Sequence, residues 1–240
     1  LVHSATGTEI VVTAASSGAQ SGAVVVLSTT GSIVTSPRTW EYIEVGAVSN
    51  VSPNVGQAGT YVQISGARLR GSGEGVSRVT LAGVEATLLD HTSDVVNVQA
   101  TSGAAQVGDV VLTANTEATV TLTDGWTYST AGEIDTVSPS TGQYGTRVDI
   151  VGSNLRGAGA SVEKVALAGT DVLSIDSESN TLISVVADHA DAGAAAGSVM
   201  VWADTGALTT LDGSWQYLVE GAIADVSPAS GQYGTRVEIS

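Results

Sequence analysis

The sequence predicts an all-β protein built from tandem copies of a small β-sandwich, and three observations lead to this fold class. The 240 residues are rich in Val, Thr, Ser, Ala and Gly and contain no Phe and no Cys. β-Branched residues pack well on a pleated sheet, and glycines mark the turns between strands. The other two observations are an internal repeat and, within it, an alternation of polar and apolar residues with a period of two.

The internal repeat is visible in two landmarks. The segment Val51–Thr60 returns as Val137–Thr146 and again as Val226–Thr235. A Trp-x-Tyr motif also occurs three times, and its copies are 86 and 89 residues apart, as are Pro53, Pro139 and Pro228 of the first landmark. Two landmarks with one period establish a repeating unit. We divide the chain into repeat 1 (1–46, the C-terminal part of a unit), repeats 2 (47–132) and 3 (133–221), both complete, and repeat 4 (222–240, opening strands).

The strands of repeat 3 follow one another along the sequence. The first carries Val137, and the next, at 147–151, alternates so that Val148 and Ile150 share a face. A strand with Val165 and Leu167 precedes a Gly turn and a short strand near Val172, and 176–180 is expected to be a solvated hairpin loop. The last three strands are expected at 182–186, 198–202 and 214–218. About seven short strands are typical of an immunoglobulin-like sandwich.

Each complete repeat contains, in this order, the patterns Pro-x-x-Gly-x-x-Gly-Thr, x-Val-x-Ile-x-Gly-x-x-Leu and Val-x-Leu-x-Gly. In this order of patterns the chain resembles the IPT/TIG family. This resemblance implies an early-type immunoglobulin-like sandwich that serves for spacing or recognition, as in plexins, some transcription factors and large surface proteins. Unlike the plexin branch, the chain has no cysteines, and it lacks the basic loops of the transcription-factor branch. The matching residues are Pro53, Gly56, Gly59, Thr60, Ile64, Gly66, Leu69 and Gly83 in repeat 2, and Pro139, Gly142, Gly145, Thr146, Ile150, Gly152, Leu155 and Gly169 in repeat 3.

The connections between repeats are short, so we expect a semi-rigid rod. Only five residues separate Tyr128 from Ile134, and such a linker cannot act as a long flexible coil. An acidic residue lies near each junction (Glu44, Glu133 and Glu220). Calcium at the junctions is not favoured, because calcium takes six to eight oxygen ligands and one carboxylate is far too few.

Neither end of the chain coincides with an expected boundary between repeats. The favoured interpretation is an array that continues beyond this window. The alternative is that 231–240 adds strands to the incomplete sandwich of a neighbouring chain.

The composition also bears on partners and on catalysis. Twenty-four acidic residues against eight basic ones give a net charge of −16, which disfavours nucleic acid and anionic membranes. No segment is expected to insert into a membrane. The three histidines fall at different places in their repeats, so no zinc site is expected. Without a Gly-x-Ser-x-Gly elbow or a cysteine nucleophile, we expect no enzyme, no catalytic residue and no cofactor.

Four residues are candidate sites. Asn50 opens an Asn-Val-Ser sequon and is a candidate for N-glycosylation. Tyr144 and Tyr233 are candidates for exposed contacts between repeats or chains; repeat 2 has Ala58 at the matching place. Trp202, which replaces Thr113 of repeat 2, is the fourth candidate, either stacking on a sugar or a neighbouring chain or, as we favour, packing half-buried.

We therefore expect an extracellular or cell-surface structural protein, a glycosylated stalk, fibre or filament of many repeats. Its partners would be copies of itself, neighbouring repeats and covalent glycans. The alternative is an adhesin or a module that recognises carbohydrate or protein. A recognition module predicts that the loops of one repeat diverge into an aromatic or acidic pocket, whereas a scaffold predicts uniform loops.

Overall fold

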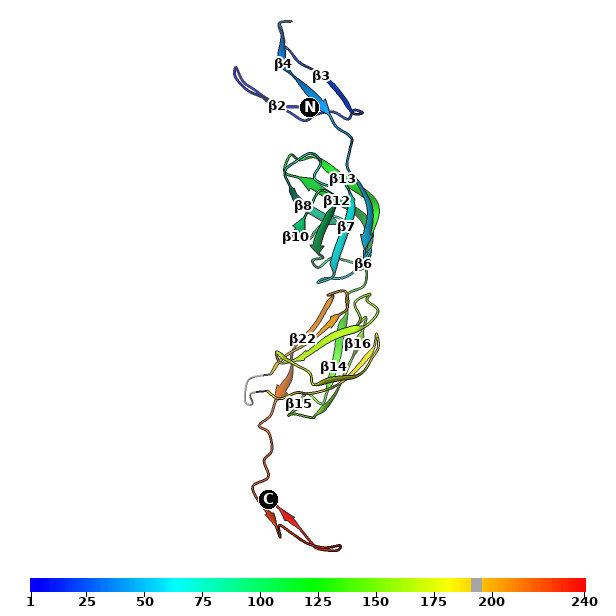
Figure 1. Ribbon diagram of the computed structural model, residues 1–240, viewed down its shortest axis with the longest axis vertical. Coiled ribbons are helices and arrows are strands. Elements are labelled where there is room, and N and C mark those ends of the chain that lie inside the picture. Colours follow the sequence, from blue (N-terminus) through cyan, green and yellow to red (C-terminus); the bar gives the residue numbers. More distant parts are fainter. Residues whose placement is uncertain (191–195) are drawn as a thin grey trace.

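The chain forms an elongated series of β-structures placed end to end (Figure 1). The computed structural model describes residues 1–190 and 196–240, and in these residues every regular element is a strand. The all-β prediction and the tandem sandwiches are thus confirmed. Among the described residues, none forms a helix with the length and apolarity that a membrane crossing requires.

Repeats 2 and 3 share one topology, a four-stranded sheet facing a five-stranded sheet. In repeat 2 the strand orders are β10-β11-β7-β5 and β6-β13-β12-β8-β9. The strands of repeat 2 are β5 (Ala47–Ser52), β6 (Val55–Gly56), β7 (Tyr61–Ala67), β8 (Val76–Leu81), β9 (Val84–Glu85), β10 (Thr87–His91), β11 (Val95–Gln99), β12 (Gln106–Ala114) and β13 (Thr119–Tyr128).

Repeat 3 reproduces this arrangement with orders β14-β16-β20-β19 and β15-β22-β21-β17-β18. Its strands are β14 (Glu133–Ser138), β15 (Thr141–Gly142), β16 (Arg147–Ser153), β17 (Val162–Leu167), β18 (Thr170–Asp171), β19 (Ser174–Glu178), β20 (Leu182–Val186), β21 (Gly197–Ala203) and β22 (Leu208–Tyr217).

Repeats 1 and 4 contain paired strands only. Repeat 1 has two hairpins, and repeat 4 has one, which follows an extended segment (Figure 1). Their strands are β1 (Val2–Ala5), β2 (Ile10–Val12), β3 (Gln20–Leu27), β4 (Ile33–Tyr42), β23 (Val226–Ser227) and β24 (Glu238–Ile239).

Two expectations about repeat 3 are corrected. Nine strands form rather than about seven, because β15, a two-residue strand, and β19 were not anticipated. The segment 176–180, expected as a loop, lies mostly in β19, which pairs with β20. Polar side chains are accommodated there because β19 lies at the edge of its sheet and turns one face toward solvent. Glu178 accepts a hydrogen bond from Arg156 Nε at 2.7 Å, and this partner raises the pKa of Arg156.

Each complete repeat has its own apolar core between the two sheets. Trp126 and Trp215 are fully buried, and each packs edge-on against the tyrosine two residues later, with ring centroids 5.6 and 5.5 Å apart. Val148 and Ile150 are also fully buried, which confirms their predicted face. In repeat 1, where no second sheet covers β3 and β4, the equivalent Trp40 is 51% exposed.

The first strand of each repeat crosses from one sheet to the other. β5 pairs antiparallel with β7, the chain then passes the cis peptide Ser52–Pro53, and β6 pairs parallel with β13 of the opposite sheet. This crossing places the loop from Gly56 to Thr60 at the end of repeat 2 that faces repeat 3. The junction between the repeats is built on this loop.

Candidate functional site at the junction of two repeats

The loop that follows β6 is preorganised by its own side chains. Thr60 Oγ1 accepts a hydrogen bond from the backbone N–H of Gln57 at 3.2 Å, and the backbone N–H of Thr60 donates to the backbone oxygen of Gln57 at 3.2 Å. Gly59 has a φ of 90°, which favours glycine there. The same Thr–Gln bond forms at Thr146 and at Thr235, so the loop is a constant feature of the repeats.

Gln57 joins repeat 2 to the linker and to repeat 3. Its side chain is only 3% exposed. Oε1 accepts from Gly132 N at 2.6 Å, while Nε2 lies 3.3 Å from both Leu208 O and Thr209 Oγ1. A buried amide with these partners holds three segments together. We call this set of hydrogen bonds the glutamine clasp.

Backbone hydrogen bonds extend the clasp. Tyr61 N donates to Thr205 O at 2.9 Å, and Leu208 N donates to Ala58 O at 3.1 Å. Both partners in repeat 3 belong to the hairpin between β21 and β22. The loop of repeat 2 and the hairpin of repeat 3 are therefore fastened by main chain as well as by side chains.

Gly132 of the linker lies in a space that admits no side chain. A Cβ at this position would overlap Thr209 Oγ1 and would come within 2.7 Å of Asn154 O. A Cβ at Gly46, the matching position before repeat 2, would overlap Arg68 O and the side chain of Val120 in the same way. The linker therefore packs against the repeat that follows it.

One hydrogen bond of the clasp recurs at the end of repeat 3. Gln143 Oε1 accepts a hydrogen bond from Gly221 N at 2.9 Å, the counterpart of the bond between Gln57 and Gly132. Repeat 3 thus holds the start of the next linker as repeat 2 does.

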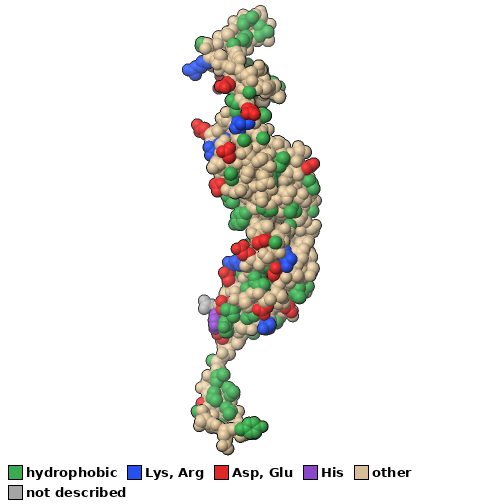
Figure 2. Space-filling view, turned by 45° about the vertical axis from the view of Figure 1, so that its right-hand side comes forward, with side chains coloured by type: hydrophobic (Ala, Val, Ile, Leu, Met, Phe, Trp, Pro, Cys, Tyr) green, Lys and Arg blue, Asp and Glu red, His purple; other side chains and the backbone are tan. Residues whose placement is uncertain are grey.

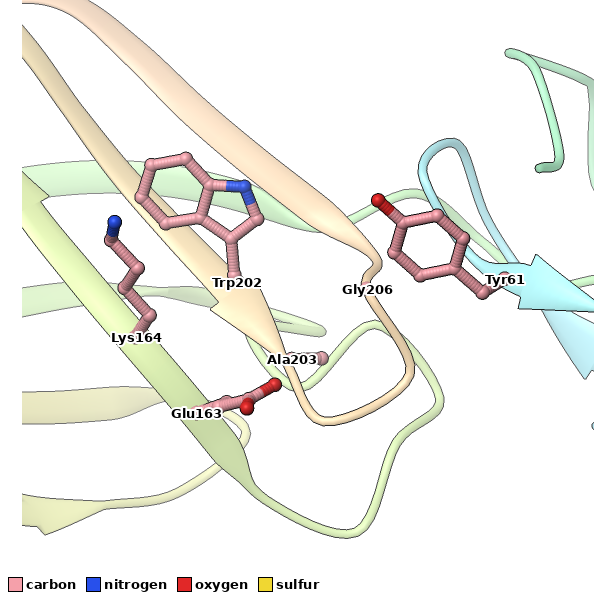
Figure 3. Close-up of a pocket in the computed structure, with 6 residues that line it drawn as sticks. All are labelled: Tyr61, Glu163, Lys164, Trp202, Ala203 and Gly206. Atoms are coloured by element: carbon pink, nitrogen blue, oxygen red, sulfur yellow. The ribbon is translucent and has the colours of Figure 1, made fainter. Parts of the chain in front are cut away.

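A shallow groove runs along the outside of the junction (Figure 3). It has a volume of 440 Å³, and Trp202 on β21 and Tyr61 on β7 lie on opposite sides of the hairpin at Gly206. Lys164 Nζ lies 5.1 Å from the centroid of the Trp202 ring and 2.9 Å from Asp171 Oδ1. The lining residues are Tyr61, Glu163, Lys164, Trp202, Ala203 and Gly206.

A second groove, of 330 Å³, starts at the same Tyr61 and runs over the outer face of the four-stranded sheet of repeat 2. Polar side chains form a hydrogen-bonded row across this face. Gln63 Nε2 donates to Asn97 Oδ1 at 3.3 Å, and Asn97 Nδ2 donates to Asp90 Oδ1 at 2.8 Å. Leu89 is exposed beside them.

The structure places the predicted site residues apart from one another. Asn50 is exposed on β5, and Trp202 is half-buried in the junction groove. Tyr144 is 43% exposed and stacks on His189, with ring centroids 3.8 Å apart, and Tyr233 is fully exposed in repeat 4. Their roles in glycosylation or contact remain predictions.

The acidic residues near the junctions have separate surroundings. Glu44 pairs with Arg68 at 3.1 Å, Glu220 pairs with His189 at 2.7 Å, and Glu133 is exposed. Over residues 1–190 and 196–240, no group of three or more His, Asp or Glu side chains is arranged to hold a metal ion.

Sequence reasoning missed the residues that build the junction, Gln57, Tyr61 and Gly132. A signal was present, because a Gly-Gln pair recurs at 56–57, 142–143 and 231–232, and a linker glycine recurs at 46, 132 and 221. Nothing in the sequence indicated that these two signals contact each other.

Comparison with known proteins agrees with this architecture. The model of the IPT/TIG domain matches residues 47–129 and 133–217. No curated protein matches the chain.

Solved structures resemble parts of this chain at low identity. The plexin A4 extracellular region (domains 1 to 10) is 21% identical with a TM-score of 0.49, over 76% of this chain and 16% of that one. SGBP-B from a xyloglucan utilization locus of Bacteroides uniformis is 17% identical with a TM-score of 0.30, over 72% of this chain and 50% of that one. The chain thus spans half or less of these two proteins.

Proposed function

Because the chain belongs to the IPT/TIG domain family, we propose that it is a non-catalytic structural component of an extracellular or cell-surface stalk, fibre or filament. Its repeats would act as rigid spacers in series. The glutamine clasp carries this proposal, since it fixes repeat 3 on repeat 2 and its first hydrogen bond is repeated at the end of repeat 3.

The surface supports the same role. Acidic side chains are scattered over both complete repeats, and basic ones are fewer (Figure 2). A net charge of −16 keeps such a rod soluble and opposes binding to nucleic acid. Asn50 is exposed on β5, where an N-linked glycan has room. In a filament, exposed aromatic residues such as Tyr144 and Tyr233 would supply contacts between chains.

Electron microscopy of the native material tests this proposal, together with mass spectrometry of intact chains and released glycans. Regular fibres or stalks of glycosylated chains are the expected result. A dispersed monomer without glycans would contradict it.

A second candidate function is recognition by the array, as an adhesin or a ligand-binding module. It is favoured by one difference between otherwise equivalent surfaces. Tyr61 and Leu89 are exposed on repeat 2, whereas the matching residues of repeat 3, Arg147 and Asp176, form an ion pair at 3.2 Å. A pure spacer gives no reason for one repeat to expose apolar side chains at this place.

A further inference from the structure

We propose that the surface around Tyr61, which spans the junction of repeats 2 and 3, binds an extended neutral polysaccharide. This inference rests on the second candidate function, recognition, and specifies its ligand. The residues concerned, which we call the Tyr61 surface, are Tyr61, Gln63, Leu89, Asp90, Asn97 and Trp202.

The two grooves described above meet at Tyr61. One continues past Gly206 to Trp202 on repeat 3, and the other continues over the sheet face of repeat 2 to Asp90. Figure 3 shows the phenol and the indole on either side of the Gly206 hairpin. The joint surface is long, shallow and open, a shape that suits a chain molecule better than a small compact ligand.

The side chains on this surface have the chemistry that recognises sugars. The rings of Tyr61 and Trp202 offer flat apolar faces with a polar tip, which can pack on the C–H face of a pyranose. The Gln63, Asn97 and Asp90 side chains supply donors and acceptors for hydroxyl groups, and Glu163 and Lys164 do so beside Trp202. Hydrogen bonds within the Gln63 row hold its groups in place, so little freedom is lost on binding.

The Tyr61 surface is not a general requirement of the repeat. In repeat 3 the positions of Tyr61, Leu89 and Gln63 hold Arg147, Asp176 and Asp149. The first two close over the face as an ion pair, and Asp149 accepts a hydrogen bond from Ser184. Repeat 2 has Thr113 at the position of Trp202. The two aromatic side chains of this surface, Tyr61 and Trp202, thus lie on the two sides of one junction and have no aromatic counterpart in the other complete repeat.

Other ligands fit less well. Tyr61, Gln63 and Asn97 lie on β7 and β11, which are interior strands of their sheet, so a peptide lying on them would find no unpaired backbone edge. A polyanion, whether nucleic acid or an acidic polysaccharide, would be repelled by a chain of net charge −16. A neutral polysaccharide makes use of the rings and the amides without this penalty.

Affinity electrophoresis of the full chain tests the proposal, in native gels that contain hydroxyethylcellulose, galactomannan, arabinoxylan or, as a charged comparison, alginate. We expect at least one neutral polysaccharide to retard the chain and alginate to leave it unaffected. Trp202→Thr, which installs the residue of repeat 2, should weaken binding at least about tenfold, equivalent to about 1.4 kcal/mol. Tyr61→Arg with Leu89→Asp, the residues of repeat 3, should do the same.

Two controls separate binding from folding and from assembly. Leu173→Ala removes an exposed apolar side chain outside the Tyr61 surface and should bind as the parent does. Trp202→Thr should keep the parent's melting temperature within a few degrees and should form the same fibres by electron microscopy. No retardation by any neutral polysaccharide, retardation by alginate alone, or binding that survives both groove variants would overturn the inference. Fibres without sugar binding would leave the spacer function standing.

Discussion

At the scale of single residues, the junction depends on one buried amide. The hydrogen bonds of Gln57 reach the linker and the β21–β22 hairpin of repeat 3, and its side chain is buried. A buried polar group that loses its partners costs free energy, so each member of the clasp needs the others.

Gln57→Ala should lower the free energy of unfolding by about 1–3 kcal/mol, because Gly132 N and Leu208 O lose their partner. Chemical denaturation of the full chain measures this change. The matched control is Gln143→Ala, whose amide oxygen accepts from Gly221 N outside any contact with a complete next repeat. A change below about 0.5 kcal/mol is expected there, as for surface substitutions. Equal losses in both variants would contradict the clasp.

Two buried tyrosines give the repeats a dependence on alkaline pH. Burial raises the pKa of Tyr128 and of Tyr217 above the ordinary value of 10.0, and Asp188 raises that of Tyr217 further. Because each tyrosine has a higher pKa in the folded state than in the unfolded state, its contribution to the free energy of unfolding is complete at pH values below the unfolded-state pKa. This contribution is lost as the pH rises through the folded-state pKa.

The unfolding free energy should therefore fall as the pH rises above about 10, by at most about 1.4 kcal/mol per pH unit for each tyrosine. Urea denaturation between about pH 8 and pH 11 measures the slope. The double variant Tyr128→Phe with Tyr217→Phe keeps both rings and should show a smaller slope. An unchanged slope would assign the effect to other groups.

At the scale of elements, the alternation of residues predicted most strands but not the short or polar ones. β20 lies at 182–186 as expected, because apolar residues there alternate toward the core. β19 was missed since Asp176, Ser177 and Glu178 lack that alternation on an edge strand that pairs only with β20. β15 is two residues long, too short for any periodicity.

The linker is an element whose role depends on contacts that the sequence does not reveal. Gly132→Ala should destabilise the full chain by about 1–3 kcal/mol, because its Cβ would overlap Thr209 and Asn154. Gly221→Ala is the matched control, as only Gln143 Oε1, at 3.9 Å, lies near the added methyl group. Thermal unfolding compares the two. A tolerated Gly132→Ala would show that the linker stands away from repeat 3.

At the scale of the whole molecule, the sequence period predicted the tandem sandwiches and the short linker predicted a semi-rigid rod. What it could not predict is how the rod is stiffened. The junction is fixed by hydrogen bonds of Gln57, Ala58 and Tyr61, whose partners on repeat 3 lie about 150 residues later, so the sequence does not show that these segments pair. Of the Tyr61 surface, the sequence singled out only Trp202 as a candidate, because Tyr61 and Trp202 line one groove only where two repeats meet.

The most direct test of the fixed junction is a distance distribution between the two repeats. The chain contains no cysteine, so spin labels can be placed at Thr121→Cys and Thr210→Cys, two exposed positions at equivalent places in repeats 2 and 3. Double electron–electron resonance on the full chain should give one narrow distribution, which broadens when Gln57→Ala is added. A broad distribution in the parent chain would contradict the account, because it would mean that the clasp does not hold the repeats together.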